Sequence, residues 1–445
     1  MNRRARRPFG RRQVAALALA AMLGAACSSP TGSNPPPNAS GSSATAPTAT
    51  TLAAAAGSDA PIGAVPWPQV GPGWTIAVWS PAVGLRIGEQ PAPGQPTYAN
   101  SPTNLYLVDP AGGRYLITSF SPPGDTASPE LVDWSGDGGQ ALFLAAYSTP
   151  PTAILVDLHT GAQTTVPFDN ADSSGGATMG VRFTRPDGKA ILVSTGFNGS
   201  TPGTLRRVDL AGHPQLTYPT AQLGGAGQFS GNYLETADGT QLVLTTANLG
   251  NELVPRTDNS LVVVRNDGSI VRPLPAPMAA ARCSPVRWWS ATVVLAHCTS
   301  FTSSANQLWE VPLDGGAPAM LTAVNSGQEN DPGFGGDLGD VDAWQLPSGV
   351  FLQSEGACGS SFLSRLTADG HTTRVAVPGV DTRHSVWVVG ASGDNTKLVV
   401  RATMNCGPGT ALLAYDPTAN TSTVLLGPQV NGGSVVAALP YPPQK

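Results

Sequence analysis

The sequence predicts an all-β fold, a single β-propeller of about seven four-stranded blades closed by the C-terminal strand. Three observations predict it. An apolar run followed by an acidic turn recurs roughly every 50 residues, a period typical of propeller blades. Asp-Gly pairs separate neighbouring apolar runs, as they do in tight β-hairpins. The chain holds 52 glycines and 42 prolines but only 12% charged residues, which suits short strands and turns rather than long helices.

The repeat is a short apolar run that ends in an acidic turn. It begins with Leu105–Val108 and is last seen in Leu412–Tyr415. The turns contain Asp109, Asp157, Asp209, Asp267, Asp314, Asp369 and Asp416. We interpret each copy as the third and fourth strands of one blade, so the copies favour seven blades, and the spacing itself leaves six to eight open.

A second pattern lies between these copies and consists of an aromatic residue, a turn and an apolar strand. Trp134 precedes Ser-Gly-Asp-Gly, and Phe183 begins the run Phe-Thr-Arg-Pro-Asp-Gly-Lys. These segments resemble the TolB-type, WD-like propeller repeat, and the resemblance covers most of residues 70–440. It implies a propeller and says almost nothing about function, because propellers carry many unrelated activities.

The first blade is one strand short. Its sequence supplies the strands Trp74–Trp79, Leu105–Val108 and Tyr115–Ser119, while the chain end supplies Val435–Leu439. We expect this last strand to complete the first blade and close the ring, which removes exposed sheet edges.

The N-terminus predicts export. Residues 1–26 join an arginine-rich start to a short apolar stretch and the small residues Gly24 to Ala26, the order of a signal peptide. Cys27 follows directly. This order resembles a bacterial lipobox, and the chain resembles an actinobacterial-type lipoprotein, which implies that Cys27 is lipidated, for example with palmitate. Either general secretion or twin-arginine export fits Arg11-Arg12.

Three regions follow from this interpretation. They are a signal peptide over 1–26, a lipidated cysteine with a disordered Ser/Thr/Pro/Ala tether over 27–62, and the propeller over 63–445. The tether lacks the large apolar side chains that would offset its ordering entropy. We therefore expect an exported protein held by its lipid on the outer face of the cell membrane.

The net charge of the chain indicates which classes of partner it can bind. Removing the six arginines of residues 1–26 from the 24 basic residues leaves 18 against 29 acidic residues, a net charge of −11. An acidic domain without a basic stripe predicts no nucleic-acid partner.

Four cysteines besides Cys27 predict two disulfides in an oxidising compartment. Centring a hairpin on Ser290-Ala291 sets Cys283 opposite Cys298, and we expect these two to pair. Cys358 and Cys406 end matching strands of neighbouring blades and form the second expected bridge. The pairings Cys283–Cys358 with Cys298–Cys406, and Cys283–Cys406 with Cys298–Cys358, remain open.

The longest predicted loops share one face of the propeller, which we call the long-loop face. They span Ser80–Thr103, Asn248–Asn259 and Asn325–Asp340. Long loops on a rigid scaffold are the usual place for a site. The densest acidic cluster lies within and just after the last of them and offers Asp337, Asp340 and Asp342 as ligands for a metal such as calcium, which prefers carboxylate oxygens.

Two functions follow. The first is a cell-envelope lipoprotein that binds a protein, peptide or glycan through the long-loop face without catalysis. It fits the absence of a complete catalytic motif such as G-x-S-x-G. The alternative is a metal-dependent propeller hydrolase or lactonase with its site at the channel mouth. The sequence predicts no other cofactor.

Overall fold

The structure is a computed structural model that divides into the units Met1–Thr48 and Ala49–Lys445. It describes residues 53–54, 59–84, 90–124, 127–146, 151–168, 178–196, 202–221, 223–224, 227–247, 261–300, 303, 305–324, 337–356, 360–381, 384–403, 409–427 and 432–442. All of these lie in the second unit. The predictions for residues 1–52, including Cys27, and for Cys358 and Cys406 therefore fall outside the described residues.

Three sheets contain four consecutive antiparallel strands each. Their strands are β6 (Glu130–Trp134), β7 (Gln140–Ala145), β8 (Thr152–Asp157) and β9 (Gln163–Pro167); β10 (Thr178–Phe183), β11 (Ala190–Thr195), β12 (Leu205–Asp209) and β13 (Pro214–Thr217); and β14 (Gln228–Glu235), β15 (Gln241–Ala247), β16 (Leu261–Arg265) and β17 (Ile270–Pro273).

An eight-stranded sheet holds two further series of strands, which meet at one parallel bridge between Asn306 and Gly339. The first series is β18 (Ala281–Ser290), β19 (Val293–Ser300) and β20 (Asn306–Pro312), with β21 (Ala319–Met320) paired to β20; the second is β22 (Asp337–Leu346), β23 (Gly349–Gly356), β24 (Ser361–Leu366) and β25 (Thr372–Arg374).

Two five-stranded sheets each add a short strand from the start of the described chain. In sheet order they are β2 (Asp59–Pro61), β5 (Arg114–Phe120), β4 (Thr103–Val108), β3 (Thr75–Ser80) and β30 (Ser434–Pro440); and β1 (Ala53–Ala54), β29 (Thr421–Leu426), β28 (Thr410–Asp416), β27 (Leu398–Thr403) and β26 (Val386–Ala391).

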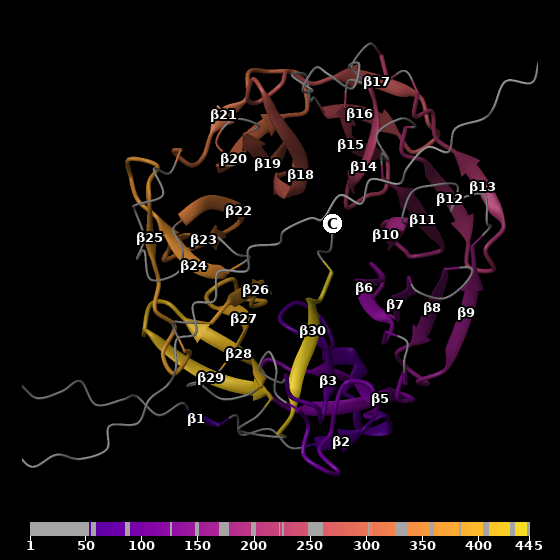
Figure 1. Cartoon of the computed structure of the whole chain (residues 1–445). Helices are drawn as coiled ribbons and strands as arrows, with labels where there is room; N and C mark the ends of the chain where they lie inside the picture. Colours follow the sequence, from indigo (N-terminus) through magenta and orange to yellow (C-terminus); the bar gives the residue numbers. More distant parts are fainter. Residues whose placement is uncertain are drawn as a thin grey trace, which may run out of the picture. The chain divides into compact units, whose positions relative to one another are not determined.

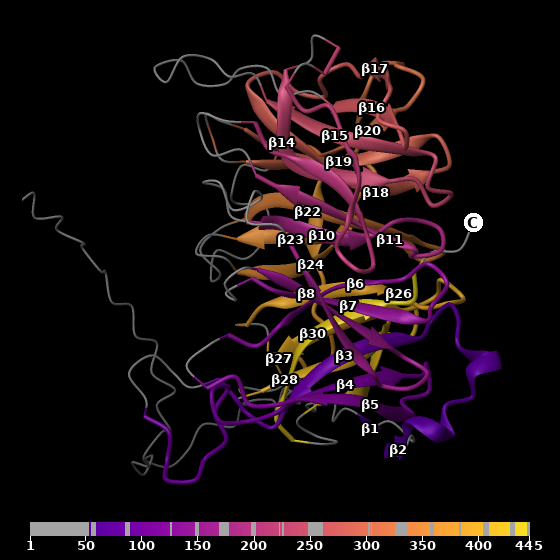
Figure 2. The ribbon, with the colours of Figure 1, turned by 90° about the vertical axis from the view of Figure 1, so that its right-hand side faces the viewer.

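Within the unit Ala49–Lys445 the sheets stand around a common centre (Figure 1). The first strand of a series, such as β6, β10 or β14, lies nearest the centre, and the last, such as β9 or β13, lies outermost. Figure 2 shows the sheets from the side, with β17 at one end of the view and β2 at the other. This is the arrangement of a β-propeller, so the predicted all-β class of four-stranded antiparallel sheets is confirmed.

Helical structure among the described residues is limited to two short 3-10 turns, η1 (Ile62–Ala64) and η2 (Trp67–Gln69). None of the described helices is long and apolar enough to cross a membrane.

The apolar core lies between neighbouring sheets. Leu142 of β7, for example, belongs to one buried cluster with Val181 of β10 and Val193 of β11. All three side chains are at most 1% exposed. Each such side chain stabilises the fold by about 1.5–3 kcal/mol relative to leaving it in water. The apolar runs of the sequence repeat therefore hold adjacent sheets together as well as forming them.

The C-terminal strand β30 pairs antiparallel with β3, at the place expected for the missing strand of the first blade. Trp79 faces Val435 and Val78 faces Ala437. The chain enters β30 through Gly433, whose φ is +62°, and a Cβ there would lie 2.0 Å from the Ser80 carbonyl oxygen. Glycine is therefore required for the close approach of the chain to the end of β3.

Two strands lie inside the segment predicted to be tether. Strand β1 pairs parallel with β29, and β2 pairs parallel with β5. The side chain of Asp59 also accepts a hydrogen bond from Arg114 Nε at 2.7 Å. Folded structure thus begins before residue 63. The physical reason is that an outer strand edge offers unpaired backbone groups, which a chain without large apolar side chains can still satisfy.

The predicted Cys283–Cys298 disulfide is present. Strands β18 and β19 set the two cysteines directly opposite each other, with their Cα atoms 4.0 Å apart. Both side chains are fully buried. The predicted pairing is therefore confirmed, but the predicted centre of the hairpin is wrong by one residue. Ser290 pairs with Val293, so the turn is at residues 291–292, and register shifts between Pro285 and Arg287 and between Trp288 and Ser290 bring the cysteines opposite each other.

Candidate functional site

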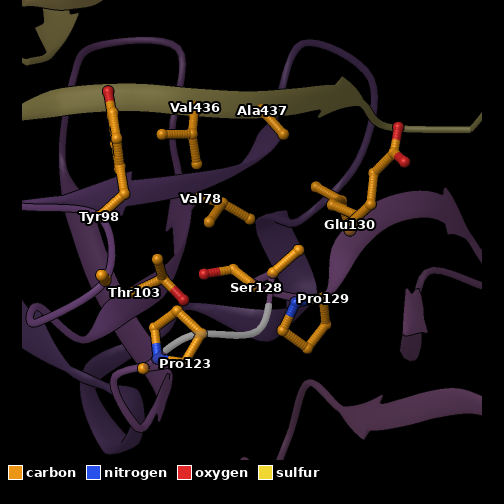
Figure 3. A pocket seen from close by; sticks show the side chains of 13 residues that line it. Val78, Tyr98, Thr103, Pro123, Ser128, Pro129, Glu130, Val436 and Ala437 are labelled. Carbon is orange, nitrogen blue, oxygen red and sulfur yellow. The ribbon is translucent and has the colours of Figure 1, made fainter. Parts of the chain in front are cut away.

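A cavity of about 560 Å³ lies among β3, β6, β30 and two loops, and we call it the inter-sheet cavity (Figure 3). The lining residues that the structure describes are Val78, Tyr98, Ala99, Thr103, Pro123, Gly124, Ala127, Ser128, Pro129, Glu130, Leu131, Val436 and Ala437. Residues 98–103 end the loop Ser80–Thr103, so the cavity lies at one of the three long loops that the sequence singled out. Its size is within the range of small-ligand sites.

The cavity walls are mainly apolar. Val436 and Ala437 come from β30, Val78 from the neighbouring β3, and Leu131 from the first strand of the next sheet. Figure 3 shows Val436 and Ala437 on one side of the cavity and Val78 below them. Segments more than 300 residues apart in the sequence therefore build one wall.

Four side chains give the cavity its polar groups. They are the phenol of Tyr98, the hydroxyls of Thr103 and Ser128, and the carboxylate of Glu130. Tyr98 is 42% exposed and Thr103 is buried. Tyr98 and Glu130 lie at opposite sides of the cavity in Figure 3. A ligand that fills the cavity can therefore meet a phenol at one end and a carboxylate at the other.

Local hydrogen bonds fix the loop that carries Tyr98. Gln95 Oε1 accepts from the Ala92 amide at 2.8 Å, and Asn100 Oδ1 accepts from the Thr97 amide at 2.7 Å. The Gly124 amide donates to the Ala99 carbonyl at 3.0 Å and joins the loop to the second one. Polar side chains that bond their own backbone define turns without needing an apolar core. Tyr98 is thus held in place although it is exposed.

A cation lies beside the Tyr98 end of the cavity. Arg401 of β27 donates to the Val436 carbonyl, and its guanidinium stands 4.5 Å from the centre of the Trp387 ring. Burial lowers the pKa of Arg401, and an electrostatic interaction with Tyr98 opposes that shift. The cavity is therefore electrically asymmetric, with the Arg401 charge near Tyr98 and the Glu130 charge at the other side.

The cavity offers a ligand both apolar surface and a few polar groups. Ser128 supplies a hydroxyl, and Glu130 is the only acid among the lining residues that the structure describes. The arrangement fits recognition of a partly apolar ligand by shape and a few polar contacts.

The predicted metal ligands all lie on β22, but they are bonded to different groups. Both oxygens of Asp342 accept from Arg287, at 2.5 Å each. Asp340 is fully buried, and its Oδ1 accepts from Ser354 Oγ at 2.6 Å. Asp337 Oδ1 accepts from the Gly339 amide at 2.8 Å. Within the described ranges, no group of three or more His, Cys, Asp or Glu side chains is placed to hold a metal ion. The calcium hypothesis stays a prediction.

Burial also changes the acidity of Asp340. Desolvation, with a smaller contribution from the neighbouring Asp337, raises its pKa to about 7. Loss of hydration disfavours the charged form of a carboxyl group.

A second polar arrangement, absent from the sequence predictions, links four neighbouring sheets, and we call it the inner polar chain. Arg185 Nη2 donates to Asp133 Oδ1 at 2.8 Å, and the Arg185 amide donates to Glu235 Oε2 at 2.8 Å. Trp288 Nε1 of a fourth series donates to the Glu235 carbonyl at 2.8 Å. The inner polar chain follows the inner strands β6, β10, β14 and β18, so it connects sheets where they approach the centre.

Glu235 is the unusual member of the inner polar chain. It is 8% exposed, and its Oε1 is buried with no hydrogen-bond partner among the described residues. Desolvation raises its pKa from 4.5 to about 7. In the sequence, Glu235 occupies the position before the turn that Trp134 and Phe183 hold in other repeats. That exception to the repeat is the signal that could have identified it.

Part of the inter-sheet cavity was not predicted. Residues 123–124 and 127–131 and Val436–Ala437 gave no signal, because an apolar residue that lines a cavity has the same sequence pattern as one that fills a core. Only the loop before Thr103 was identified in advance.

Neither protein-family models nor curated proteins match this chain. Solved structures with similar folds include the β-propeller domain of the Trilobed protease from Pyrococcus furiosus, at 12% identity and a TM-score of 0.48, covering 81% of this chain and 94% of that one. TolB from Acinetobacter baumannii is similar at 12% identity and a TM-score of 0.41, with 83% of this chain and 67% of that one covered. A prolyl endopeptidase is similar at 14% identity and a TM-score of 0.48 over 79% of this chain. The chain spans about half, 49%, of that peptidase.

Proposed function

We propose that this chain is a cell-envelope lipoprotein whose propeller binds a protein, peptide or glycan in the inter-sheet cavity at its long-loop face, without catalysing a reaction. The observation that carries the proposal is the cavity of about 560 Å³ with apolar walls and a few polar groups at its rim. Sites that bind a ligand's apolar part and orient it by a few polar contacts have this composition.

The fold part of the proposal is a ring of seven blades that β30 closes. The two series β18–β21 and β22–β25 count as separate blades because a single bridge joins them. The pairing of β30 with β3 supports closure, since it gives one sheet strands from both ends of the chain.

The anchoring part of the proposal is lipidation of Cys27, with the membrane as a partner through that lipid. It rests on the basic, apolar and small-residue order before Cys27. In this arrangement the propeller acts on the outer face of the cell membrane.

The alternative, a metal-dependent hydrolase or lactonase, would use carboxylates such as Asp337 and Asp340. It is less supported because Asp342 is already bonded to Arg287 and Asp340 to Ser354. Metal analysis of the purified protein separates the two functions, since a stoichiometric divalent ion would favour the alternative.

Site-specific photo-crosslinking in cells tests the binding function. We expect a photoreactive residue at Tyr98 to give a discrete adduct, and one at the exposed turn residue Lys189 to give none. Ser128→Phe or Ala437→Phe, which fill the cavity, should each remove the Tyr98 adduct. Two variants are needed because Ala437 also packs against a core cluster. Identical adducts at both positions, or an adduct that both filled variants retain, would refute the proposal.

A further inference from the structure

We infer that the group entering the inter-sheet cavity is a cationic side chain with an apolar stem, an arginine or lysine of a partner peptide, whose charged head meets Glu130. This inference rests on the proposed binding function and specifies the ligand of the same cavity. Three observations support it: the Glu130 carboxylate has no partner among the described residues, the wall beside it is apolar, and Arg401 interacts with Tyr98.

Glu130 is the only acidic residue among the described residues that line the cavity. It begins β6, where its partner in the register is Leu144 of β7 rather than a basic residue. No hydrogen bond or ion pair among the described residues involves its side chain. An exposed carboxylate at the rim of an apolar cavity is therefore available to a ligand.

The surfaces next to Glu130 are apolar. Pro129 and Leu131 flank it in the chain, and Val436 and Ala437 line the same cavity. Arginine and lysine bury their methylene stems along apolar surfaces and keep the charged head in a polar environment. The wall and the carboxylate together match both parts of such a side chain, whereas a carbohydrate would leave the apolar wall poorly covered.

Arg401 fixes the direction of binding. Its guanidinium donates to the Val436 carbonyl and interacts electrostatically with Tyr98, and Tyr98 lies opposite Glu130 in Figure 3. A second cation is repelled there and attracted to the carboxylate, because like charges repel and opposite charges attract over these distances. The charged head therefore lies at the Glu130 end.

The net charge of the whole chain also favours a cationic ligand. Its formal net charge is −5, and the six arginines of residues 1–26 lie outside the propeller. An acidic domain attracts basic partners and raises their association rate.

Two matched peptides test the inference on the full chain in detergent solution. They are acetyl-Leu-Arg-amide and acetyl-Leu-citrulline-amide, which differ in charge but hardly in shape. We expect calorimetry to give about fivefold tighter binding of the arginine peptide, the effect of one charge pair at a partly exposed rim. Glu130→Gln should bring the two affinities together. Asp369→Asn, which removes an exposed acid from a remote turn, should leave the fivefold difference unchanged.

The outcomes distinguish a failure of this inference from a failure of the proposed binding function on which it rests. If both peptides bind equally and Ser128→Phe blocks both, the cavity binds ligands but the cation preference is wrong. If the arginine peptide keeps its advantage in Glu130→Gln, the assignment to Glu130 is refuted. If neither peptide binds, the inferred ligand class is wrong, while the Tyr98 crosslinking experiment still decides the proposed function.

Discussion

Glu235 makes the stability of this propeller depend on pH. Its pKa is 4.5 when unperturbed and about 7 in the folded protein, because burial disfavours the charged form. The folded state therefore binds a proton more tightly than the unfolded state does. The stability from this proton is fully present below pH 4.5 and is lost as the pH rises through about 7. A difference of about 2.5 pKa units corresponds to about 3 kcal/mol of unfolding free energy.

The perturbation that isolates this effect is Glu235→Gln. Glutamine keeps an oxygen that can accept from the Arg185 amide, but it cannot ionise. We expect the variant to gain about 3 kcal/mol relative to the parent between pH 4 and pH 8. Most of the gain should fall between pH 5 and pH 7.5.

Urea unfolding of parent and variant at half-unit pH intervals measures this difference directly. Comparing the two proteins at each pH cancels the contribution of Asp340, which has the same sign because burial also raises its pKa. A constant difference in unfolding free energy across the whole range would refute the reasoning. So would a variant whose relative stability falls as the pH rises.

Three further predictions concern the N-terminal lipidation signal, the C-terminal strand and the disulfides. Cys27→Ser should move the protein from the membrane fraction to the soluble fraction, and a variant that stays membrane-bound would contradict lipidation. Deleting residues 433–445 removes β30 and the fully buried Val435, so unfolding free energy should fall by at least about 3 kcal/mol; a truncated protein that melts like the parent would contradict a structural role for β30. Non-reducing peptide mapping should recover Cys283 joined to Cys298, and a second bridge between Cys358 and Cys406; four free thiols in protein taken from the envelope would contradict both.

Local sequence patterns were sufficient to predict the class of fold and the pairing of some neighbouring strands. Apolar runs and Asp-Gly turns are local signals, since a hairpin needs only its own two strands and turn. Such local signals were enough to predict that Cys283 pairs with Cys298, although the turn lies one residue later than expected and two register shifts compensate for the difference. The long loop before Thr103 was also found in this way, because turn-rich segments between apolar runs are visible without a structure.

The tertiary structure decided what the side chains at the site do. The sequence predicts Asp342 as a metal ligand because it lies in a cluster of acids. In the structure, Arg287, which is 55 residues away in the sequence, donates to both of its carboxylate oxygens. The cavity joins Val78, Glu130 and Val436, and no pattern in the sequence relates them. The pKa of Glu235 is raised because neighbouring parts of the fold bury its side chain away from water. Burial, cavity volume and charge pairing depend on chains that meet in space, so they became visible only once the sheets were placed around one centre.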